Sequence, residues 1–194
     1  MKLIFATNNQ HKVDEIKAVL PPAISIITLK EAGIDVEIPE PFDTLKENAA
    51  QKAHTIYAMT HTDCFSEDTG WEVDALNGEP GVRSARYAGE DRQFDNNIDK
   101  LLANLKPYSN RSAQFKTVIC LLLNNKEYYF EGICRGRITT ESVGTGGFGY
   151  DAVFIPEGAT QTFAQMSLSE KNLYSHRRKA TDSLVTFLND CIDK

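Results

Sequence analysis

The chain has 194 residues, of which 41% are hydrophobic and 25% are charged, and its formal net charge is −6. This length and composition are typical of one globular domain with a full core. The acidic balance argues against a general nucleic-acid binder, which would carry a basic face. The four cysteines form no Cys-x-x-Cys pair, so no zinc or redox motif is present. The N-terminus lacks the apolar core of a signal peptide and no apolar run approaches the ~20 residues of a membrane span, so we expect a cytosolic protein.

The chain opens with a predicted strand over residues 2–6, a polar loop, Thr7-Asn8-Asn9-Gln10-His11-Lys12, and a helix that ends near two prolines at about residue 20. Loop amides, a hydroxyl and a helix N-terminus favour an anion, and Lys12 adds a charge suited to phosphate. The loop lacks the glycines and spacing of a P-loop. A capped helix start with a solvated lysine is an equally good interpretation.

A short strand is predicted over residues 24–29, an irregular acidic segment over 33–41 and a long helix over 44–60. In this helix Asn48 and Lys52 are one turn apart and share a face. That face suits phosphate, although charges of this kind are more often solvated.

The next predicted strand, residues 63–68, ends in Glu67 and Asp68, and a Gly-rich, turn-rich loop follows over 69–91. Because successive strand residues point to opposite sides, we expect one carboxylate to face a ligand cleft and the other the far side. A carboxylate here suits a divalent cation or a water molecule to be activated. A turn-capping aspartate is the alternative.

The following elements are a helix over 95–105, a hairpin of strands 112–123 and 127–135, the loop 144–151 and a strand over 152–156. The loop reads Gly-Thr-Gly-Gly-Phe-Gly-Tyr-Asp, and its glycines allow positive φ and close approach of a ligand. Its aromatic, phenol and carboxylate groups suit a nucleotide. Three of its glycines match the dinucleotide spacing, but that motif requires a following helix, so we reject a Rossmann fingerprint. A plain Gly-rich turn stays open.

The last elements are a short one near residues 162–166 and a helix over 175–191, beside which Lys171, His176 and Arg177 gather. This cluster suits a polyanion or a base, although a lone histidine is more often structural. Helices between strands, together with one antiparallel hairpin, indicate an α/β fold with a mixed sheet. In open α/β sheets, ligands bind at strand ends.

These segments, in this order, resemble the inosine triphosphate pyrophosphatase family of hydrolases, which remove non-standard purine nucleoside triphosphates. The matching stretches are residues 7–12, 47–53, 66–78, 80–90, 144–151 and 175–177. The resemblance implies a single two-lobed α/β domain with a long twisted mixed sheet flanked by helices, an active site in the cleft between lobes, and a homodimer. It implies Mg²⁺-dependent hydrolysis of ITP, dITP and XTP to the nucleoside monophosphate and pyrophosphate.

The resemblance also implies roles for individual residues. Asp68 would accept a proton from the attacking water, and Glu40 and Asp68 would bind Mg²⁺. The implied substrate-binding residues are Thr7, Asn8, Asn9, Gln10, His11, Lys12 and Lys52 for the phosphates, Thr69, and Phe148, Gly149, Tyr150, Asp151, Lys171, His176 and Arg177 for the rest of the nucleotide.

Four positions depart from the pattern of the family. Glu67 stands where aspartate is usual and Thr69 where serine is common, and both keep the chemistry. Trp71 replaces an aliphatic residue and is expected to change the packing behind the site. Arg178 replaces a glycine and is expected to affect the local backbone more than the reaction. Two other functions stay open: a nucleotide-binding regulator without turnover, and a related pyrophosphatase with a different base preference.

Overall fold

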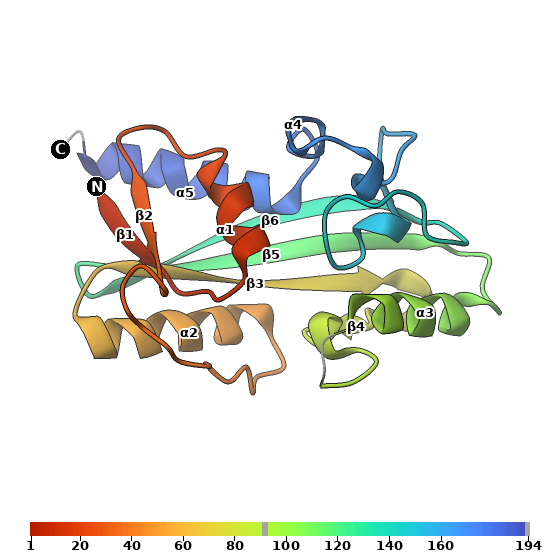
Figure 1. Ribbon diagram of the computed structural model, residues 1–194, viewed down its shortest axis with the longest axis horizontal. Coiled ribbons are helices and arrows are strands. Elements are labelled where there is room, and N and C mark those ends of the chain that lie inside the picture. The colour runs from red at the N-terminus through yellow and green to blue at the C-terminus, as the bar shows by residue number, and fades with distance from the viewer. Residues whose placement is uncertain (91–92, 193–194) are drawn as a thin grey trace. The chain divides into compact units, whose positions relative to one another are not determined.

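The computed structural model describes residues 1–90 and 93–192, and Figure 1 shows its helices and strands. The chain divides into two compact units. Unit 1 comprises Met1–Asp68, Thr117–Gly132 and Arg177–Lys194, and unit 2 comprises Thr69–Lys116 and Ile133–His176. The helices are α1 (Gln10–Lys17), α2 (Leu45–Thr60), α3 (Phe94–Leu105), α4 (Leu168–Lys171) and α5 (His176–Ile192). The strands are β1 (Lys2–Phe5), β2 (Ser25–Thr28), β3 (Cys64–Val73), β4 (Pro80–Gly81), β5 (Ser112–Leu123), β6 (Lys126–Ile138) and β7 (Phe154–Pro156).

The strands form one mixed sheet in the order β2-β1-β3-β5-β6-β7, with β4 paired to β3. β1 runs parallel to both β2 and β3, whereas β4 and β7 are antiparallel to their neighbours. The β5–β6 hairpin turns at Asn124 and Asn125, which both have positive φ, as a tight hairpin turn requires. The predicted α/β fold with a mixed sheet and flanking helices is therefore confirmed.

Unit 1 has helices on both faces of its strands. Side chains that alternate along β1, such as Phe5 and Ile4, point into two separate cores. One core contains residues of α1 and α5, and the other contains the apolar stripe of α2. Figure 1 shows α2 on the opposite side of these strands from α5.

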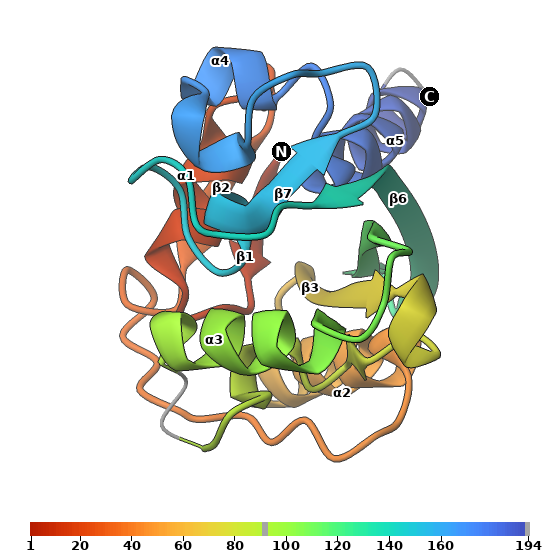
Figure 2. The ribbon, with the colours of Figure 1, turned by 90° about the vertical axis from the view of Figure 1, so that its right-hand side faces the viewer.

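Unit 2 has a core rich in aromatic residues. Trp71 and Phe115 contribute from β3 and β5, and Phe154 and Phe163 from β7 and the turn that follows it. β7 pairs with the end of β6, as Figure 2 shows. Gly136 of β6 permits this contact, because a Cβ there would lie 2.6 Å from the Phe154 ring.

Several predicted boundaries are corrected by the structure. β3 continues to Val73 inside the predicted loop, because Trp71 and Val73 are fully buried on one side of it; Asp91, at the end of that loop, lies outside the described residues. The strand predicted over 152–156 begins with a 3₁₀ turn and narrows to β7. The unpredicted α4 is fixed by a capping box of Ser167 and Glu170. No helix among residues 1–90 and 93–192 is long and apolar enough to cross a membrane.

Candidate active site

A buried lysine gathers two carboxylates in unit 1. Lys52 lies on α2, where Thr44 caps the helix by accepting a hydrogen bond from the backbone N–H of Glu47. The Lys52 ammonium forms an ion pair with Glu40 and lies 3.5 Å from Asp68 Oδ1. Asp68 lies in the middle of β3 and is the last residue of its unit 1 segment. Burial opposes the charged form of Lys52, but the charges of Asp68 and Glu40 outweigh burial and raise its pKa. Lys52 is therefore a fixed cation beside both carboxylates.

Asn48 ties the Glu40 segment to α2. Its side chain is 1% exposed, accepts a hydrogen bond from the backbone N–H of Phe42 at 3.0 Å and donates one to the Phe42 carbonyl at 3.0 Å. Because Phe42 is two residues from Glu40, these two hydrogen bonds fix the segment that carries Glu40. Sequence analysis placed Asn48 on the face of Lys52 but did not foresee this clamp.

A second charge network joins Glu67 to α1 and α5. Lys12 Nζ lies 3.0 Å from Glu67 Oε1, and Arg177 Nε donates to Glu67 Oε2 at 2.8 Å. Arg177 also forms an ion pair with Glu15, and its side chain is almost fully buried. Burial would raise the pKa of Glu67, but the charges of Arg177 and Lys12 outweigh it and lower this pKa to about 2. Glu67 is therefore ionised at every physiological pH.

Glu67 and Asp68 face opposite sides of the sheet, as the alternation of a strand predicts. Glu67 contacts residues of α1 and α5, whereas Asp68 contacts Lys52 of α2. The two carboxylates therefore act in separate groups.

The loop before α1 is held mainly by its own side chains. Asn9 caps the helix by accepting from the Lys12 backbone N–H, and Thr7 Oγ1 accepts from the Asn9 N–H at 3.2 Å. Asn8 donates to the Val36 carbonyl at 3.0 Å, and Gln10 donates to Asp14 at 2.7 Å. His11 is exposed. The capped helix start is confirmed, but Lys12 is half-buried and paired with Glu67 rather than solvated. Phosphate binding by these residues stays a prediction.

The oxygen donors in unit 1 suit a hard divalent cation. Glu40 and Asp68 present carboxylates to one shared point at Lys52, and carboxylate oxygens are the ligands that Mg²⁺ prefers. Among the described residues, no group of three or more His, Cys, Asp or Glu side chains could hold a metal ion. Mg²⁺ is usually bound by one or two carboxylates together with substrate phosphates and water.

The Gly-rich loop of unit 2 is organised around Asp151. Asp151 Oδ2 accepts from the Phe148 backbone N–H at 3.0 Å and from Lys171 Nζ at 2.6 Å. Gly147 has φ +71°, and a Cβ there would lie 2.1 Å from Asp151 Oδ2, so only glycine fits. The Lys171 ammonium also lies 5.1 Å from the centre of the Phe148 ring. A cation, a carboxylate and an aromatic ring are thus fixed together.

The other predicted residues of unit 2 differ in exposure. Tyr150 is buried and donates to the Ser84 carbonyl at 2.7 Å, and burial raises the pKa of its phenol. His176 is buried and stacks on Phe115 with ring centres 4.6 Å apart. Thr69 and Gly149 are half-buried.

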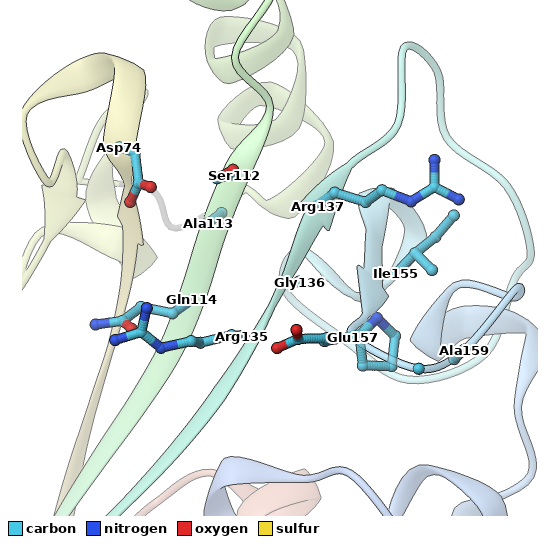
Figure 3. Close-up of a pocket in the computed structure, with 12 residues that line it drawn as sticks. Asp74, Ser112, Ala113, Gln114, Arg135, Gly136, Arg137, Ile155, Glu157 and Ala159 are labelled. Carbon is cyan, nitrogen blue, oxygen red and sulfur yellow. The ribbon is translucent and has the colours of Figure 1, made fainter.

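A shallow polar cavity of about 460 Å³ lies elsewhere in unit 2 (Figure 3). Gln114 and Arg135 line it from β5 and β6, and their neighbours Phe115 and Cys134 point into the aromatic core instead. Arg135 and Arg137 extend in different directions in this view, so they do not converge on one ligand. No predicted site residue lines this cavity, and we do not assign it as the active site.

Glu15 is a site residue that sequence analysis missed. It is 8% exposed on α1 between Lys12 and Ile16, and it contacts Arg177. The available signal was a carboxylate directly beside the apolar positions Val13 and Ile16 of that helix. A charge in that place is rarely buried unless it has a partner.

Carboxylate–cation groups in unit 1 and a glycine-rich aromatic loop in unit 2 are features that suit an enzyme of phosphorylated ligands. The model of the Ham1 family matches residues 3–187. A protein of Flavobacterium psychrophilum named dITP/XTP pyrophosphatase is 50% identical, over 98% of this chain and 100% of its own. A protein of the same name from Porphyromonas gingivalis is 48% identical, over 96% and 97%.

Solved structures agree with this result. The Ham1 protein of Staphylococcus aureus has a TM-score of 0.88 and 37% identity, covering 98% of this chain and 99% of its own. The HAM1 protein of Coxiella burnetii has a TM-score of 0.89 and 34% identity over the same shares. The chain belongs to the Ham1 family.

Proposed function

We propose that this protein hydrolyses the non-standard purine nucleoside triphosphates ITP, dITP and XTP to the nucleoside monophosphate and pyrophosphate. The observation that carries the proposal is that relatives about 50% identical over nearly the whole chain are dITP/XTP pyrophosphatases by name. The group of Asp68, Lys52 and the half-buried Glu40 offers a carboxylate to activate water and a cation for phosphate.

In the proposed reaction, Asp68 accepts a proton from the attacking water. The water oxygen forms a bond to the α-phosphorus, the bond from that phosphorus to the bridging oxygen breaks, and pyrophosphate leaves. Lys52 and Lys12 provide positive charge to the phosphates, and Glu67 holds Lys12 and Arg177 in place. The residues Thr7, Asn8, Asn9, Gln10 and His11 complete the proposed phosphate site.

Glu40 and Asp68 are the residues that would hold Mg²⁺. When bound, the metal neutralises phosphate charge during phosphoryl transfer. The Lys52 ammonium holds both carboxylates close together through its own charge.

Base recognition is assigned to unit 2. Phe148 offers a ring for stacking, and the Asp151–Lys171 pair offers an acceptor and a donor in fixed positions. A donor aimed at the 6-carbonyl of hypoxanthine or xanthine rejects adenine, because a buried donor would be left unpaired, at a cost of about 1–3 kcal/mol. Thr69, Gly149, Tyr150, His176 and Arg177 are proposed to shape the rest of the nucleotide site.

The decisive experiment measures pyrophosphate release from ATP, GTP, CTP, UTP, ITP, dITP and XTP, with and without Mg²⁺. Fast Mg²⁺-dependent turnover of ITP, dITP and XTP with slow turnover of the common four supports the proposal. Binding of ITP without turnover would establish a regulator instead, and broad or pyrimidine-biased turnover would establish a pyrophosphatase with another base preference.

We also propose that the protein is a cytosolic homodimer. Light scattering on the purified protein tests whether it is a dimer.

A further inference from the structure

The only tryptophan of the chain lies at the centre of an aromatic stack in unit 2. Trp71 is 0% exposed, and its ring centre lies 4.2 Å from that of Tyr150 and 5.4 Å from that of Phe115. Phe115 in turn stacks on His176 at 4.6 Å, with the two rings only 8° from parallel. Trp71 therefore touches the Gly-rich loop directly and reaches the start of α5 through one intervening ring.

Hydrogen bonds between backbone groups and side-chain hydroxyls fix the same contacts. The Trp71 N–H donates to Ser84 Oγ at 2.8 Å, and the Ser84 carbonyl accepts from the Tyr150 hydroxyl at 2.7 Å. Ser84 is thus shared between the strand that carries Trp71 and the loop that carries Tyr150. Packing and hydrogen bonding impose one arrangement on both segments.

The indole N–H of Trp71 carries a cost in stability. Trp71 Nε1 is buried and has no hydrogen-bond partner among the described residues. Buried tryptophan N–H groups usually find a partner, and leaving one unpaired costs stability. A phenylalanine or leucine would avoid this cost but would offer a smaller surface to the rings of Tyr150 and Phe115.

We propose that Trp71 is a positioning residue for base discrimination, which acts by holding Tyr150 directly and His176 through Phe115. The inference rests on the proposed function, because those two residues belong to the nucleotide site proposed above. Trp71 itself does not contact substrate. A small displacement of groups that contact a substrate is enough to lower the rate strongly.

The first test uses tryptophan fluorescence, which reports on Trp71 alone. The wild-type protein is titrated with IMP, AMP and pyrophosphate, none of which is a triphosphate substrate. We expect IMP to change the emission of Trp71, and AMP and pyrophosphate to leave it unchanged at the same concentrations. Emission that does not respond to IMP, in a protein shown to bind IMP by calorimetry, would overturn the inference.

The second test compares Trp71→Leu and Trp71→Phe with Leu101→Ala. Leu101 is equally buried in the same core but comes from α3, so it controls for loss of packing. We expect the ratio of kcat/KM for ITP to that for ATP to fall ~10-fold in Trp71→Leu, less in Trp71→Phe and not at all in Leu101→Ala. All three variants are expected to have a lower Tm.

The outcomes separate the two proposals. A wild-type protein that shows no preference for ITP over ATP refutes the proposed function and this inference together. A selective wild type whose Trp71→Leu and Trp71→Phe variants keep the full ITP/ATP ratio refutes only the inference and makes Trp71 a packing residue. If Trp71→Leu does not fold, Trp71→Phe and the fluorescence titration still decide.

Discussion

Replacing Asp68 with asparagine tests the centre of the proposed mechanism. Asparagine has almost the same size and keeps a carbonyl oxygen, but it cannot take a proton from water. Asp68 is 6% exposed, and its Oδ1 lies 3.5 Å from the Lys52 ammonium. Lys52 keeps its ion pair with Glu40 in the variant, so its charge is not left without a partner.

The expected magnitudes follow from this geometry. Loss of a general base lowers kcat by about 10²- to 10⁴-fold, which corresponds to about 3–5 kcal/mol in the barrier. Loss of one of two carboxylates at a buried ammonium costs roughly 1–3 kcal/mol of stability, less than the 5–15 kcal/mol typical of a folded domain. We therefore expect a folded protein with almost no turnover.

The assay is pyrophosphate release from ITP with Mg²⁺, together with thermal melting of each variant. Asp63→Asn is the matched control, because Asp63 precedes the same strand and its Oδ1 accepts a hydrogen bond from Asn124 that an amide oxygen can also accept. We expect near-normal activity in the control. Turnover of Asp68→Asn within a few-fold of the wild type would remove Asp68 from the role of proton acceptor.

Three further perturbations probe other parts of the site. Gly147→Ala should raise the KM for ITP ~10-fold, because its methyl group would lie 2.1 Å from Asp151 Oδ2. Gly158→Ala controls for backbone strain, since Gly158 has φ +84° and a Cβ there would have no heavy atom nearer than 3.9 Å. This control should keep normal kinetics. Asn48→Ala should raise the Mg²⁺ concentration for half-maximal activity ~10-fold by releasing the Glu40 segment, and an unchanged metal titration would contradict this. The pKa of Glu67 is about 2 in the folded protein and about 4.3 in the unfolded chain. Glu67 therefore stabilises the fold above pH ~4.3 by up to ~3 kcal/mol, and this contribution is lost as the pH falls toward 2. Urea unfolding at a series of pH values should show that loss in the wild type and much less of it in Glu67→Gln.

The sequence predicted elements well where apolar periodicity was regular. The hairpin of β5 and β6 and the long helix α2 agree with the predicted ranges to within a few residues. β3 was predicted too short, because Glu67 and Asp68 look like the polar end of a strand. Both are buried in the structure since cations neutralise them, and the strand continues past Gly70 to Val73. Polarity alone could not reveal partners that lie far away in the chain.

The same limit explains which site residues were missed. Glu15 is 162 residues from Arg177 in sequence, so no local pattern connects them. Asn48 looks like a solvated amide at the start of a helix, and only the path of the preceding segment makes it a clamp. By contrast, the glycines around Asp151 could be predicted, because positive φ and close packing leave glycine as the one residue that fits.

The charges around Lys52 bear on the proposed metal site. Glu40 and Asp68 both contact the Lys52 ammonium, whereas Glu67 contacts Lys12 and Arg177 on the other side of the sheet. Buried ion pairs contribute little to stability, because the cost of removing them from water cancels most of their attraction. Their value is that fixed charges need no rearrangement when a reaction shifts charge. Carboxylates beside a triphosphate repel it unless further positive charge arrives with it. In the proposed mechanism, a nucleotide that carries Mg²⁺ provides that charge where Glu40 and Asp68 would hold it.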